Sequence, residues 1–377
     1  MSTTDEHYIG LMTGTSMDAV DAVLVRFTSG TPGVTLIATA SQPIPTALRR
    51  ELLAVDQHST IALISELDAR LGALFGDAVN HLLATASVPP DAVTAIGSHG
   101  QTVLHLPDAD WPRSVQLGDP NRIAEMTGIT TVADFRRRDI AAGGQGAPLA
   151  PAFHHALFGR PDEDRMIVNI GGMANLTVLL AGAPTASLGF DTGPGNVLMD
   201  AWCRQHRGTD YDDNGDWARS AAPDTALLNR LLDDAWFDLS PPKSTGRDQF
   251  NQRWLTERLR EHPASAATVQ STLCELTALS IARAILRWTP ARTTPARIVL
   301  CGGGANNATL LERLGQHLPG SPIDRSDVHG IGATWVEAVG FAWLAKARIE
   351  QTPASLPDTT GAQHANVLGG IYPGLHR

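Results

Sequence analysis

Lysine is nearly absent from this chain, which carries most of its positive charge on arginine. Its 377 residues hold 29 Lys and Arg against 39 Asp and Glu, and only Lys243 and Lys346 are lysines. The formal net charge of −10 argues against a general nucleic-acid or anionic-membrane surface. The one tight basic run, Arg136-Arg137-Arg138, is short and is followed at once by Asp139. We therefore expect neither a nucleic-acid nor a membrane partner.

Cysteine and long apolar runs are scarce as well. Cys203, Cys274 and Cys301 are odd in number and far apart, so they fit neither a zinc site nor a disulfide framework. We find no stretch of about 18 apolar residues and expect no transmembrane helix. The first residues, MSTTDEH, are acidic and polar, whereas a secretory signal begins with positive charge and an apolar run. These features predict a cytoplasmic protein.

Two common phosphate-binding signatures are missing. The sequence has no G-x-x-x-x-G-K-[ST] motif, which excludes a P-loop enzyme, and no HRD and DFG pair, which excludes a protein kinase. Without a P-loop lysine, the charge of a bound phosphate must be met by Mg²⁺, backbone N–H groups and arginine.

The apolar pattern predicts an α/β protein in two halves, and a length of 377 residues suggests two or three domains at about 150 residues each. Each half opens with a strand, a glycine-rich turn and a returning strand. These strands are expected at residues 8–12 and 19–27 in the first half and at 166–170 and 175–180 in the second. Helices and strands alternate after both openings, with helices expected within 59–86 and at 120–127, 197–205, 268–287 and 332–347.

These elements define the expected lobes. Residues 1–139, completed by 348–377, are expected to form an N-terminal lobe. Residues 140–347 are expected to form a C-terminal lobe with a helical insertion at about 208–265. A cleft between two such lobes is the expected ligand site of an α/β protein of this kind.

Both glycine-rich turns are candidate phosphate loops. In Gly10–Asp18, GLMTGTSMD, glycine lets the backbone approach a phosphate, and Asp18 could hold Mg²⁺ through water. The segment Asn169–Asn175, NIGGMAN, occupies the same place in the second half. Either segment could equally be an ordinary hairpin turn, where glycine is favoured. As a pair, they could grip a polyphosphate from both sides.

A third glycine cluster follows the strand expected at 297–301. Gly302-Gly303-Gly304 precedes a helix, so a flat ring or a phosphate could lie against its backbone near the helix N-terminus. The alternative is a helix cap at Asn306 or Asn307, and both interpretations can hold together.

Two further polar residues are candidates for chemistry. Asp191 lies in GFDTGPG at the expected end of the strand 187–190, among small residues, where it could act as a general base. A helix cap is the competing interpretation of Asp191, and we interpret Asp200 as an ordinary helix residue. His99, in GSHGQT, either binds a polar ligand such as a sugar or is a structural histidine whose hydrogen bonds are satisfied internally.

Taken together, these segments resemble the anhydro-N-acetylmuramic acid kinase family. The strings ADFRRRDIAAGGQGAP, residues 133–148, and GFDTGPGNVLMDAW, residues 189–202, are far more specific than any glycine motif, and the resemblance runs from about residue 8 to 372. It implies two ribonuclease-H-like lobes of the sugar kinase/Hsp70/actin type around a nucleotide cleft, and a homodimer. It also implies that ATP, water and 1,6-anhydro-N-acetylmuramic acid give ADP and N-acetylmuramic acid 6-phosphate in bacterial cell-wall recycling.

The resemblance also implies residue roles. Asp191 is the base that activates water, and the sugar contacts are Ser16, Asp18, His99 and Glu337. The ATP-phosphate loop is Gly14, Thr15, Ser16, Met17, Asp18, Ala19, Val20 and Asp21. The other two glycine segments add Gly171, Gly172, Asn175, Gly302, Gly303 and Gly304 as ATP-binding candidates. The superfamily commonly has an acidic residue where this chain has Asn169, which leaves Asp18 as the better carboxylate for Mg²⁺.

Two other functions share the expected fold. In a simple hexose kinase, Asp191 would deprotonate a sugar hydroxyl instead of water. In a sugar-sensing regulator or an actin-like assembly protein, the lobes would bind ligand without this chemistry.

Overall fold

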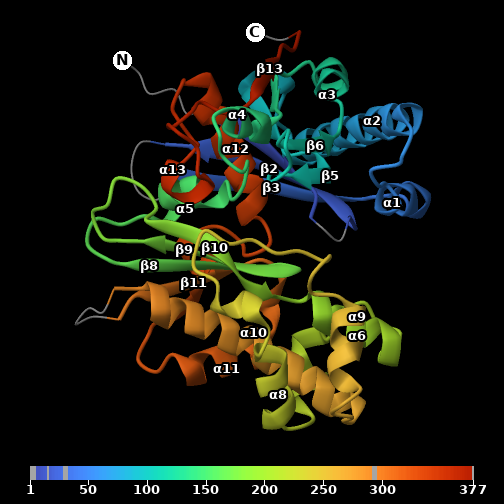
Figure 1. Cartoon of the computed structure of the whole chain (residues 1–377). Coiled ribbons are helices and arrows are strands. Elements are labelled where there is room, and N and C mark those ends of the chain that lie inside the picture. The colour runs from blue at the N-terminus through green and yellow to red at the C-terminus, as the bar shows by residue number, and fades with distance from the viewer. Residues whose placement is uncertain (1–5, 15–16, 29–32, 291–294, 376–377) are drawn as a thin grey trace. The chain divides into compact units, whose positions relative to one another are not determined.

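The computed structural model describes residues 6–14, 17–28, 33–290 and 295–375 (Figure 1). The chain divides into two compact units. Unit 1 consists of Met1–Phe158, His329–Ile331 and Trp335–Arg377, and unit 2 of Gly159–Val328 and Gly332–Thr334. Each unit has its own sheet and its own hydrophobic core.

Unit 1 is built on a six-stranded sheet in the order β13-β7-β4-β1-β2-β3. Strands β1 (Glu6–Met12), β2 (Ala19–Phe27) and β3 (Val34–Pro43) form an antiparallel meander. Strands β4 (Val93–Ser98) and β7 (Thr131–Ala133) continue the sheet parallel to β1, and β13 (Gly370–Tyr372) closes it antiparallel to β7. Strands β5 (Gln101–Leu106) and β6 (Arg113–Leu117) form a separate ribbon.

Helix α2 (Ile61–Ala86) supplies much of the core of unit 1. Its Leu67, Leu71 and Phe75 are fully buried, as the three-and-four spacing of its apolar residues predicts. Helix α3 (Pro120–Thr127) begins after the N-cap Asp119 and ends at Gly128, also as predicted. The other elements of this unit are α1 (Thr46–Leu53), a 3₁₀ turn at Pro90–Ala92, α4 (Phe135–Ala141), α5 (Ala150–Phe158) and α13 (Pro357–Thr360).

Helix α12 (Val336–Ile349) lies directly on β1 and β4, because two glycines leave room for its backbone. A Cβ on Gly10 would lie 1.8 Å from the carbonyl oxygen of Ala338, and one on Gly97 would lie 2.0 Å from that of Phe341. Helix α5 packs against α12 in the same unit. The lobe boundaries expected after residues 139 and 347 are therefore wrong, since α5 and α12 both belong to unit 1.

Unit 2 repeats the strand order of unit 1. Its sheet runs β10-β9-β8-β11-β12, which corresponds strand for strand to β3-β2-β1-β4-β7. Strands β8 (Arg165–Ile170), β9 (Met173–Leu179) and β10 (Leu188–Pro194) are antiparallel, and β11 (Arg297–Cys301) and β12 (Ile323–Arg325) run parallel to β8. This shared mixed order confirms the expected α/β fold of two ribonuclease-H-like lobes.

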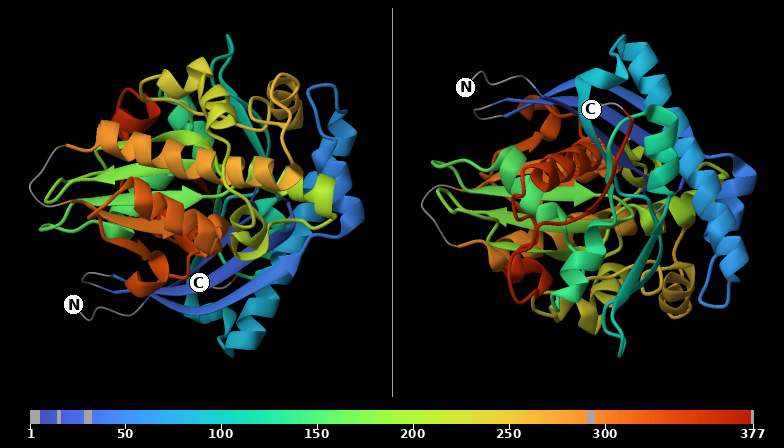
Figure 2. Two further views of the ribbon diagram at one scale, coloured as in Figure 1. Left: turned by 90° about the horizontal axis from the view of Figure 1, so that it is seen from below. Right: turned by 90° about the horizontal axis from the view of Figure 1, so that it is seen from above.

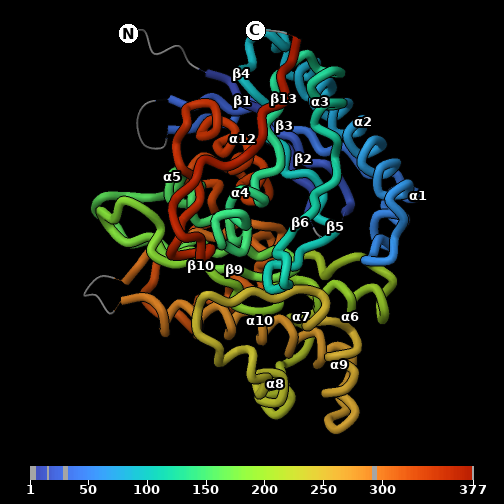
Figure 3. Tube along the Cα trace, turned by 45° about the horizontal axis from the view of Figure 1, so that its top comes forward, coloured from blue at the N-terminus to red at the C-terminus, as the bar shows by residue number. Residues whose placement is uncertain are grey.

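Residues 208–265 form helices, as expected, and also contribute to the core of unit 2. Figure 3 follows the chain from α6 (Val197–Arg207) through α7 (Asp216–Arg219), α8 (Thr225–Leu232) and α9 (Gln252–Leu259). Short 3₁₀ turns stand at Asp213–Gly215 and Ala235–Asp238. The buried side chains of Trp217, Trp236 and Trp254 join one core with α10 (Ala266–Trp288) and α11 (Ala308–His317).

Helix α10 runs along the sheet of unit 2 in the left view of Figure 2. In the described part of the chain it is the one helix that is long and apolar enough to cross a membrane. Of its most apolar 18-residue window, 72% is buried within the fold. Its apolar character is therefore explained by its place in the core.

Candidate active site

Thr13 and Met17 are described residues of the turn between β1 and β2. Thr13 is buried, and its hydroxyl lies 3.1 Å from the carbonyl oxygen of Gly100 and 2.7 Å from Oε1 of Gln101. Met17 has a positive φ of 53°, and its N–H donates to the carbonyl oxygen of Gly14 at 3.1 Å. Thr15 and Ser16, both expected at this site, lie outside the described residues.

The remaining residues of the expected phosphate loop divide into two kinds. Met17 and Val20 are buried in the core of unit 1, so they can serve a phosphate only through their backbone. Asp18 is exposed, and its Oδ1 pairs with Nη2 of Arg49 at 2.5 Å. Asp21 accepts a hydrogen bond from Ser41 at 2.8 Å, and burial raises the pKa of its carboxyl.

His99 follows β4 and is buried beside Arg136, a residue of α4. The Nη2 of Arg136 lies 2.9 Å from Nε2 of His99, and the imidazole packs on the ring of Phe341 at 4.7 Å between centroids. A guanidinium can only donate, so Nε2 is the acceptor and the proton of the neutral ring is on Nδ1. Burial and then the charge of Arg136 hold the pKa of His99 well below its usual range. His99 is therefore a neutral side chain with a fixed tautomer.

Glu337 stands in the first turn of α12, where the glycines of β1 and β4 hold that helix against the sheet. Burial raises the pKa of Glu337, Arg136 opposes this shift, and the charge of Asp21 adds to it. Burial lowers the pKa of Arg136 to about 10, and its attraction to Glu337 and Asp139 counters the effect. Asp21, Glu337 and Arg136 thus form one electrostatic group in unit 1.

The arginine run at 136–138 has mixed roles. Arg136 is inside, and its Nη1 also donates to the carbonyl oxygen of Gly146 at 2.8 Å. Arg137 is exposed and pairs with Asp134 at 3.3 Å, and Arg138 is exposed as well. Asp139 is fully buried and accepts from the backbone N–H of Gly146 at 2.7 Å and from Thr360 at 2.8 Å. Within residues 133–148, Asp139 therefore stabilises the fold, and Arg136 contacts the candidate site residue His99.

A polar cavity of about 250 Å³ lies beside His99 in unit 1. Its walls come from the ends of β4, β6 and β7, from α2 and from the start of α3, and include Ser98, Gly100, Asp68 and Asp119. Hydroxyl, carboxylate and backbone groups dominate this lining, which suits a ligand rich in hydroxyl groups.

The glycine turn of unit 2 joins β8 to β9 and is held by the start of α6. The N–H groups of Gly195 and Val197 donate to the carbonyl oxygen of Gly172 at 2.9 and 3.1 Å. Asn196 donates to that of Gly171 at 2.8 Å. A Cβ on Gly171 would meet only the carbonyl oxygen of Met173, at 3.5 Å, so one side of the turn is open. The turn is therefore rigid and accessible to a ligand.

Asp191 lies inside β10 rather than at its end, which corrects the sequence-based expectation. The expected strand end is replaced by an irregular register between Asp191 and Gly193. The backbone N–H of Thr245 donates to Oδ2 of Asp191 at 2.9 Å, and Asp191 donates its own N–H to the carbonyl oxygen of Lys243 at 3.1 Å. Asp191 is thus held by a second segment and does not cap a helix.

The environment of Asp191 favours its protonated form. Burial raises the pKa of Asp191 to about 6, while the Thr245 N–H and the charge of Lys243 oppose the shift. A carboxyl group with a pKa in this range can take up a proton near neutral pH, as a general base must.

Asp191 is part of a polar row across the sheet. It pairs with Asn175 on β9, and Asn175 pairs with Asn169 on β8. Directly paired residues project to the same face of a sheet, so these three side chains share one face. The core of unit 2 occupies the other face, with Phe190 and Leu176. Asn175, expected to contact ATP, is thereby placed next to Asp191.

In the glycine cluster after β11, a side chain would clash at Gly302 and Gly304 but not at Gly303. Gly302 has a φ of 80°, and a Cβ there would lie 2.4 Å from Oδ1 of Asn169. A Cβ on Gly304 would lie 2.3 Å from Ile170, whereas Gly303 has nothing within 4 Å. Asn307 caps α11, accepting from the N–H of Leu310 at 3.0 Å. The cap is thus confirmed, and the open backbone at Gly303 leaves room for a ligand.

A cavity of about 450 Å³ opens beside Gly303 in unit 2. Its size is that of a small-ligand pocket. Asp200 lines it, so this residue is more than the ordinary helix residue expected. The wall also includes a segment that the motifs did not single out, and the lining residues are Asn196, Met199, Asp200, Tyr211, Asp212, Asp213, Asn214, Gly303, Gly304, Asn306 and Asn307.

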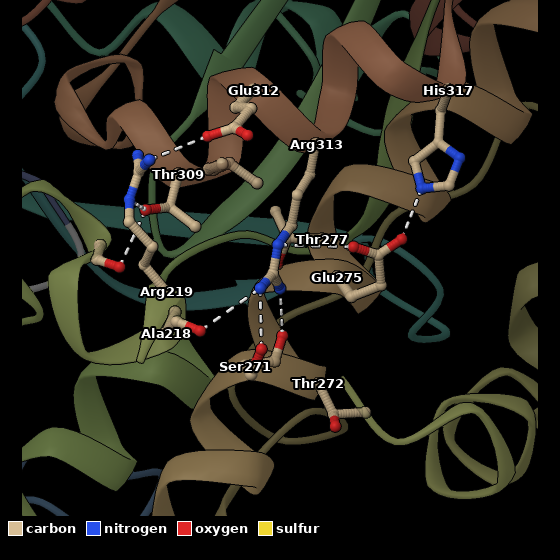
Figure 4. Close-up of polar contacts among 12 residues, drawn as sticks. Ala218, Arg219, Ser271, Thr272, Glu275, Thr277, Thr309, Glu312, Arg313 and His317 are labelled. Atoms are coloured by element: carbon tan, nitrogen blue, oxygen red, sulfur yellow. Dashed lines mark hydrogen bonds and ion pairs between the residues drawn. The ribbon is translucent and has the colours of Figure 1, made fainter. Parts of the chain in front are cut away.

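A polar network behind this cavity fixes its walls (Figure 4). The hydroxyl of Thr309 on α11 donates to the carbonyl oxygen of Gly215 at 2.9 Å, and Arg219 pairs with Glu312 at 3.0 Å. Arg313 is buried between α10 and α7, where it donates to Ser271 at 2.7 Å and to the carbonyl oxygen of Ala218 at 3.3 Å. The segment from Tyr211 to Asn214 is therefore held against α11.

Within the described residues, no group of three or more His, Cys, Asp or Glu side chains could hold a metal ion. Asp18, the expected Mg²⁺ carboxylate, is engaged by Arg49. Motif analysis assigned no site role to Arg136, to the Lys243–Thr245 segment or to the wall at 211–214, because their partners are distant in the sequence.

Known proteins match this chain over nearly its whole length. A family model described as anhydro-N-acetylmuramic acid kinase matches residues 6–374. Proteins of that name from Xanthomonas campestris pv. campestris (strain 8004) and Aliivibrio fischeri (strain ATCC 700601 / ES114) are 50% and 47% identical over 370 residues. These alignments cover 97% of both chains in the first case, and 98% of this chain and 99% of the relative in the second.

Among solved structures, the activator of the 2-hydroxyisocaproyl-CoA dehydratase from Clostridium difficile is a distant likeness. It has a TM-score of 0.48 and 11% identity, and the match covers 92% of this chain and 97% of that one. The sequence matches are far stronger and span both units. The chain belongs to the anhydro-N-acetylmuramic acid kinase family.

Proposed function

We propose that this protein uses ATP and water to open 1,6-anhydro-N-acetylmuramic acid and to phosphorylate its O6, in peptidoglycan recycling. The products are ADP and N-acetylmuramic acid 6-phosphate. Relatives named for this kinase activity, 50% identical over 97% of the chain, support the reaction. The observation that carries the chemistry is the partly buried carboxyl group of Asp191, with its pKa raised to about 6.

In the proposed reaction, the oxygen of water forms a bond to the anomeric carbon C1, and the bond from C1 to O6 breaks. O6 then needs no proton, because it takes the γ-phosphoryl group as the bond to ADP breaks. The proton of water passes to the carboxylate of Asp191. An ordinary inverting glycosidase uses two carboxyl groups, one of them to protonate the leaving oxygen, and here one suffices.

The sugar is assigned to residues of unit 1. His99 offers its Nδ1–H because Arg136 occupies Nε2, and the polar cavity beside it suits hydroxyl groups. Glu337, with its pKa raised by burial, is a further contact. Ser16 and Asp18 keep the sugar-contacting roles that the family implies. Arg136 is added as the residue that orients His99.

ATP is assigned to the glycine-rich turns. Gly14 to Asp21, with Gly171, Gly172 and Asn175, would hold the phosphates mainly through backbone N–H groups and small polar side chains. Gly302 to Gly304 would face the nucleoside, and the open backbone at Gly303 supports this. The 450 Å³ cavity beside it would take the base and ribose.

We include Mg²⁺ as the counter-ion of the ATP phosphates. This ion usually keeps several waters and binds through one or two carboxylates and the substrate. Asp18 could hold it only by releasing Arg49. Asp18→Asn should then raise the Mg²⁺ concentration that gives half-maximal rate, and Arg49→Gln should lower it. Equal Mg²⁺ dependence in both variants and the parent would exclude Asp18.

We further propose a cytoplasmic homodimer, as the family resemblance implies. Size-exclusion chromatography with light scattering should give twice the chain mass of 40.1 kDa. A mass equal to one chain across a wide range of concentrations would contradict it.

The test of the function is a coupled ADP-release assay with three sugars. The anhydro sugar should support turnover, whereas glucose and N-acetylglucosamine should not. Phosphorylation of glucose at a comparable kcat/KM would instead indicate a simple hexose kinase.

A further inference from the structure

A second cavity of unit 2, of about 420 Å³, is left unused by the proposed reaction. It lies among β10, α8, α10 and the 3₁₀ turn at Ala235–Asp238, and α8 and α10 can be located in Figure 1. Phe190 and Thr192 line it from β10. Phe190 directly precedes Asp191 in the strand and projects into the core of unit 2, from the opposite face to the Asp191 carboxyl group. The cavity is therefore separate from the reacting side of the sheet.

Positive charge exceeds negative charge around this cavity. Lys243, Arg283 and Arg287 line it, and Asp238 is the one acidic residue among the lining residues. Arg283 and Arg287 are one helical turn apart on α10, and both are exposed. Like charges four residues apart on a helix repel each other. The negative end of the α10 dipole at its C-terminus favours cations there. A bound anion would in addition relieve the repulsion between the two arginines.

The cavity also has an apolar floor. Phe237, Trp288 and Leu232 contribute to its lining, and Leu286 stands at the rim with 67% of its side chain exposed. Arg287 lies over the ring of Trp288, with its guanidinium carbon 5.1 Å from the ring centroid. Aromatic walls beside cations suit a ligand that joins a flat or aliphatic body to one anionic group.

Lys243 connects the cavity to the proposed base. Its Nζ donates to the carbonyl oxygens of Trp236 and Phe237 at 3.3 and 3.1 Å and lies 4.2 Å from the centroid of the Trp236 ring. Its own carbonyl oxygen accepts the N–H of Asp191 at 3.1 Å. The charge of Lys243 lowers the pKa of Asp191. Burial and then the charge of Arg287 lower the pKa of Lys243, while Asp238 and Asp191 oppose this shift.

We propose that this cavity binds a small anion with an apolar body, and that the occupant acts on Asp191 through Lys243. The binding half stands on the cavity alone, and the second half rests on the proposed function. An anion beside Lys243 offsets the positive charge that favours the ionised form of Asp191. Occupancy therefore moves the acidic limb of the rate profile to higher pH.

The binding test uses 8-anilinonaphthalene-1-sulfonate, an aromatic monoanion, with saturating ADP present so that the nucleotide site is filled. One equivalent should bind per chain, and the uncharged N-phenyl-1-naphthylamine should bind far more weakly. Arg283→Gln with Arg287→Gln should weaken binding of the sulfonate about tenfold, the loss of two ion pairs. The double variant Arg253→Gln and Arg260→Gln, on exposed parts of unit 2, removes the same charge and should bind normally.

Three results would overturn the binding half: equal affinity for the two probes, equal affinity in the two double variants, or binding that requires a second copy of the chain. Ala284→Trp fills the cavity without a change of charge and should abolish binding, with circular dichroism reporting its folding. Binding is measured without turnover, so its failure is distinct from failure of the proposed reaction. If the sulfonate binds but leaves the acidic limb in place, the link to Asp191 is wrong.

Discussion

The backbone N–H of Thr245 donates to Oδ2 of Asp191 at 2.9 Å across 54 residues of sequence. Together with the bond from the Asp191 N–H to the carbonyl oxygen of Lys243, it fastens the segment at 243–245 to the edge strand β10. The proposed base is therefore oriented by a backbone group, which every substitution of Thr245 except proline retains. Its orientation depends on how residues 233–245 fold.

Asp191→Asn should abolish the function of the base while it preserves the size of the side chain. We expect kcat to fall by about 10²–10⁴-fold, the usual contribution of a general base. Affinity for ATP should change little, because the nucleotide candidates lie on other segments. Turnover with isothermal titration of ATP tests this, and near-normal turnover would move the base elsewhere.

The raised pKa of Asp191 predicts two dependences on pH. The rate should fall as pH drops through about 6, where the base becomes protonated. Stability depends on pH in the opposite direction. Between the ordinary pKa of 3.8 and the raised pKa of about 6, Asp191 is protonated in the folded state and ionised in the unfolded state. The free energy of unfolding should therefore fall as pH rises from about 4 to 6.

Asp191→Asn lacks this proton and should gain stability relative to the parent over that window. Denaturant unfolding of both proteins at pH 4 and pH 7 measures the difference. An identical gap at the two values would show that the folded carboxyl titrates normally.

The sequence predicted what is local. The two glycine hairpins, the N-cap at Asp119 and the apolar face of α2 each follow from neighbouring residues, and all are present. The contact of Asp191 with Thr245 and that of His99 with Arg136 join residues 54 and 37 positions apart. Such pairs are fixed by tertiary packing, so motif analysis could identify Asp191 and His99 but not the residues that hold them.

The unit boundary shows the same limit. The N-terminal lobe was expected to end at residue 139, before the glycine-rich residues 140–150, but Asp139 binds Gly146 and Thr360 inside unit 1. Glycine there serves close packing: a Cβ on Gly144 would lie 2.3 Å from Oδ2 of Asp139. Composition alone does not separate a lobe boundary from a tightly packed loop.

Gly10→Ala and Gly97→Ala should each destabilise unit 1 by about 1–3 kcal/mol, the usual cost of overpacking. The added methyl group would clash with a backbone carbonyl of α12. Helix α12 would then have to move away from the sheet, and Glu337 in its first turn would move with it. Gly246→Ala is the matched control, because a Cβ there meets nothing within 4 Å. Thermal unfolding measures the effect, and equal midpoints for all three variants would refute the packing argument.

Arg136→Gln should release the tautomer of His99. In the parent, ¹⁵N spectra should show the proton on Nδ1 and no protonated ring at pH 6, because burial and Arg136 lower the pKa of His99. In the variant the pKa should rise, and KM for the sugar should increase more than kcat falls. Arg138→Gln on the exposed side of α4 should change none of these. A parent spectrum with the proton on Nε2 would contradict the assigned orientation.

The most direct test of the central claim follows the oxygen of water. With the anhydro sugar, ATP and ¹⁸O-labelled water, the account predicts one ¹⁸O atom at C1 of the sugar phosphate from the chemical step. The sugar product must be analysed faster than its anomeric hydroxyl exchanges with solvent. A product that forms with no ¹⁸O at C1 would contradict the claim that Asp191 directs water to that carbon.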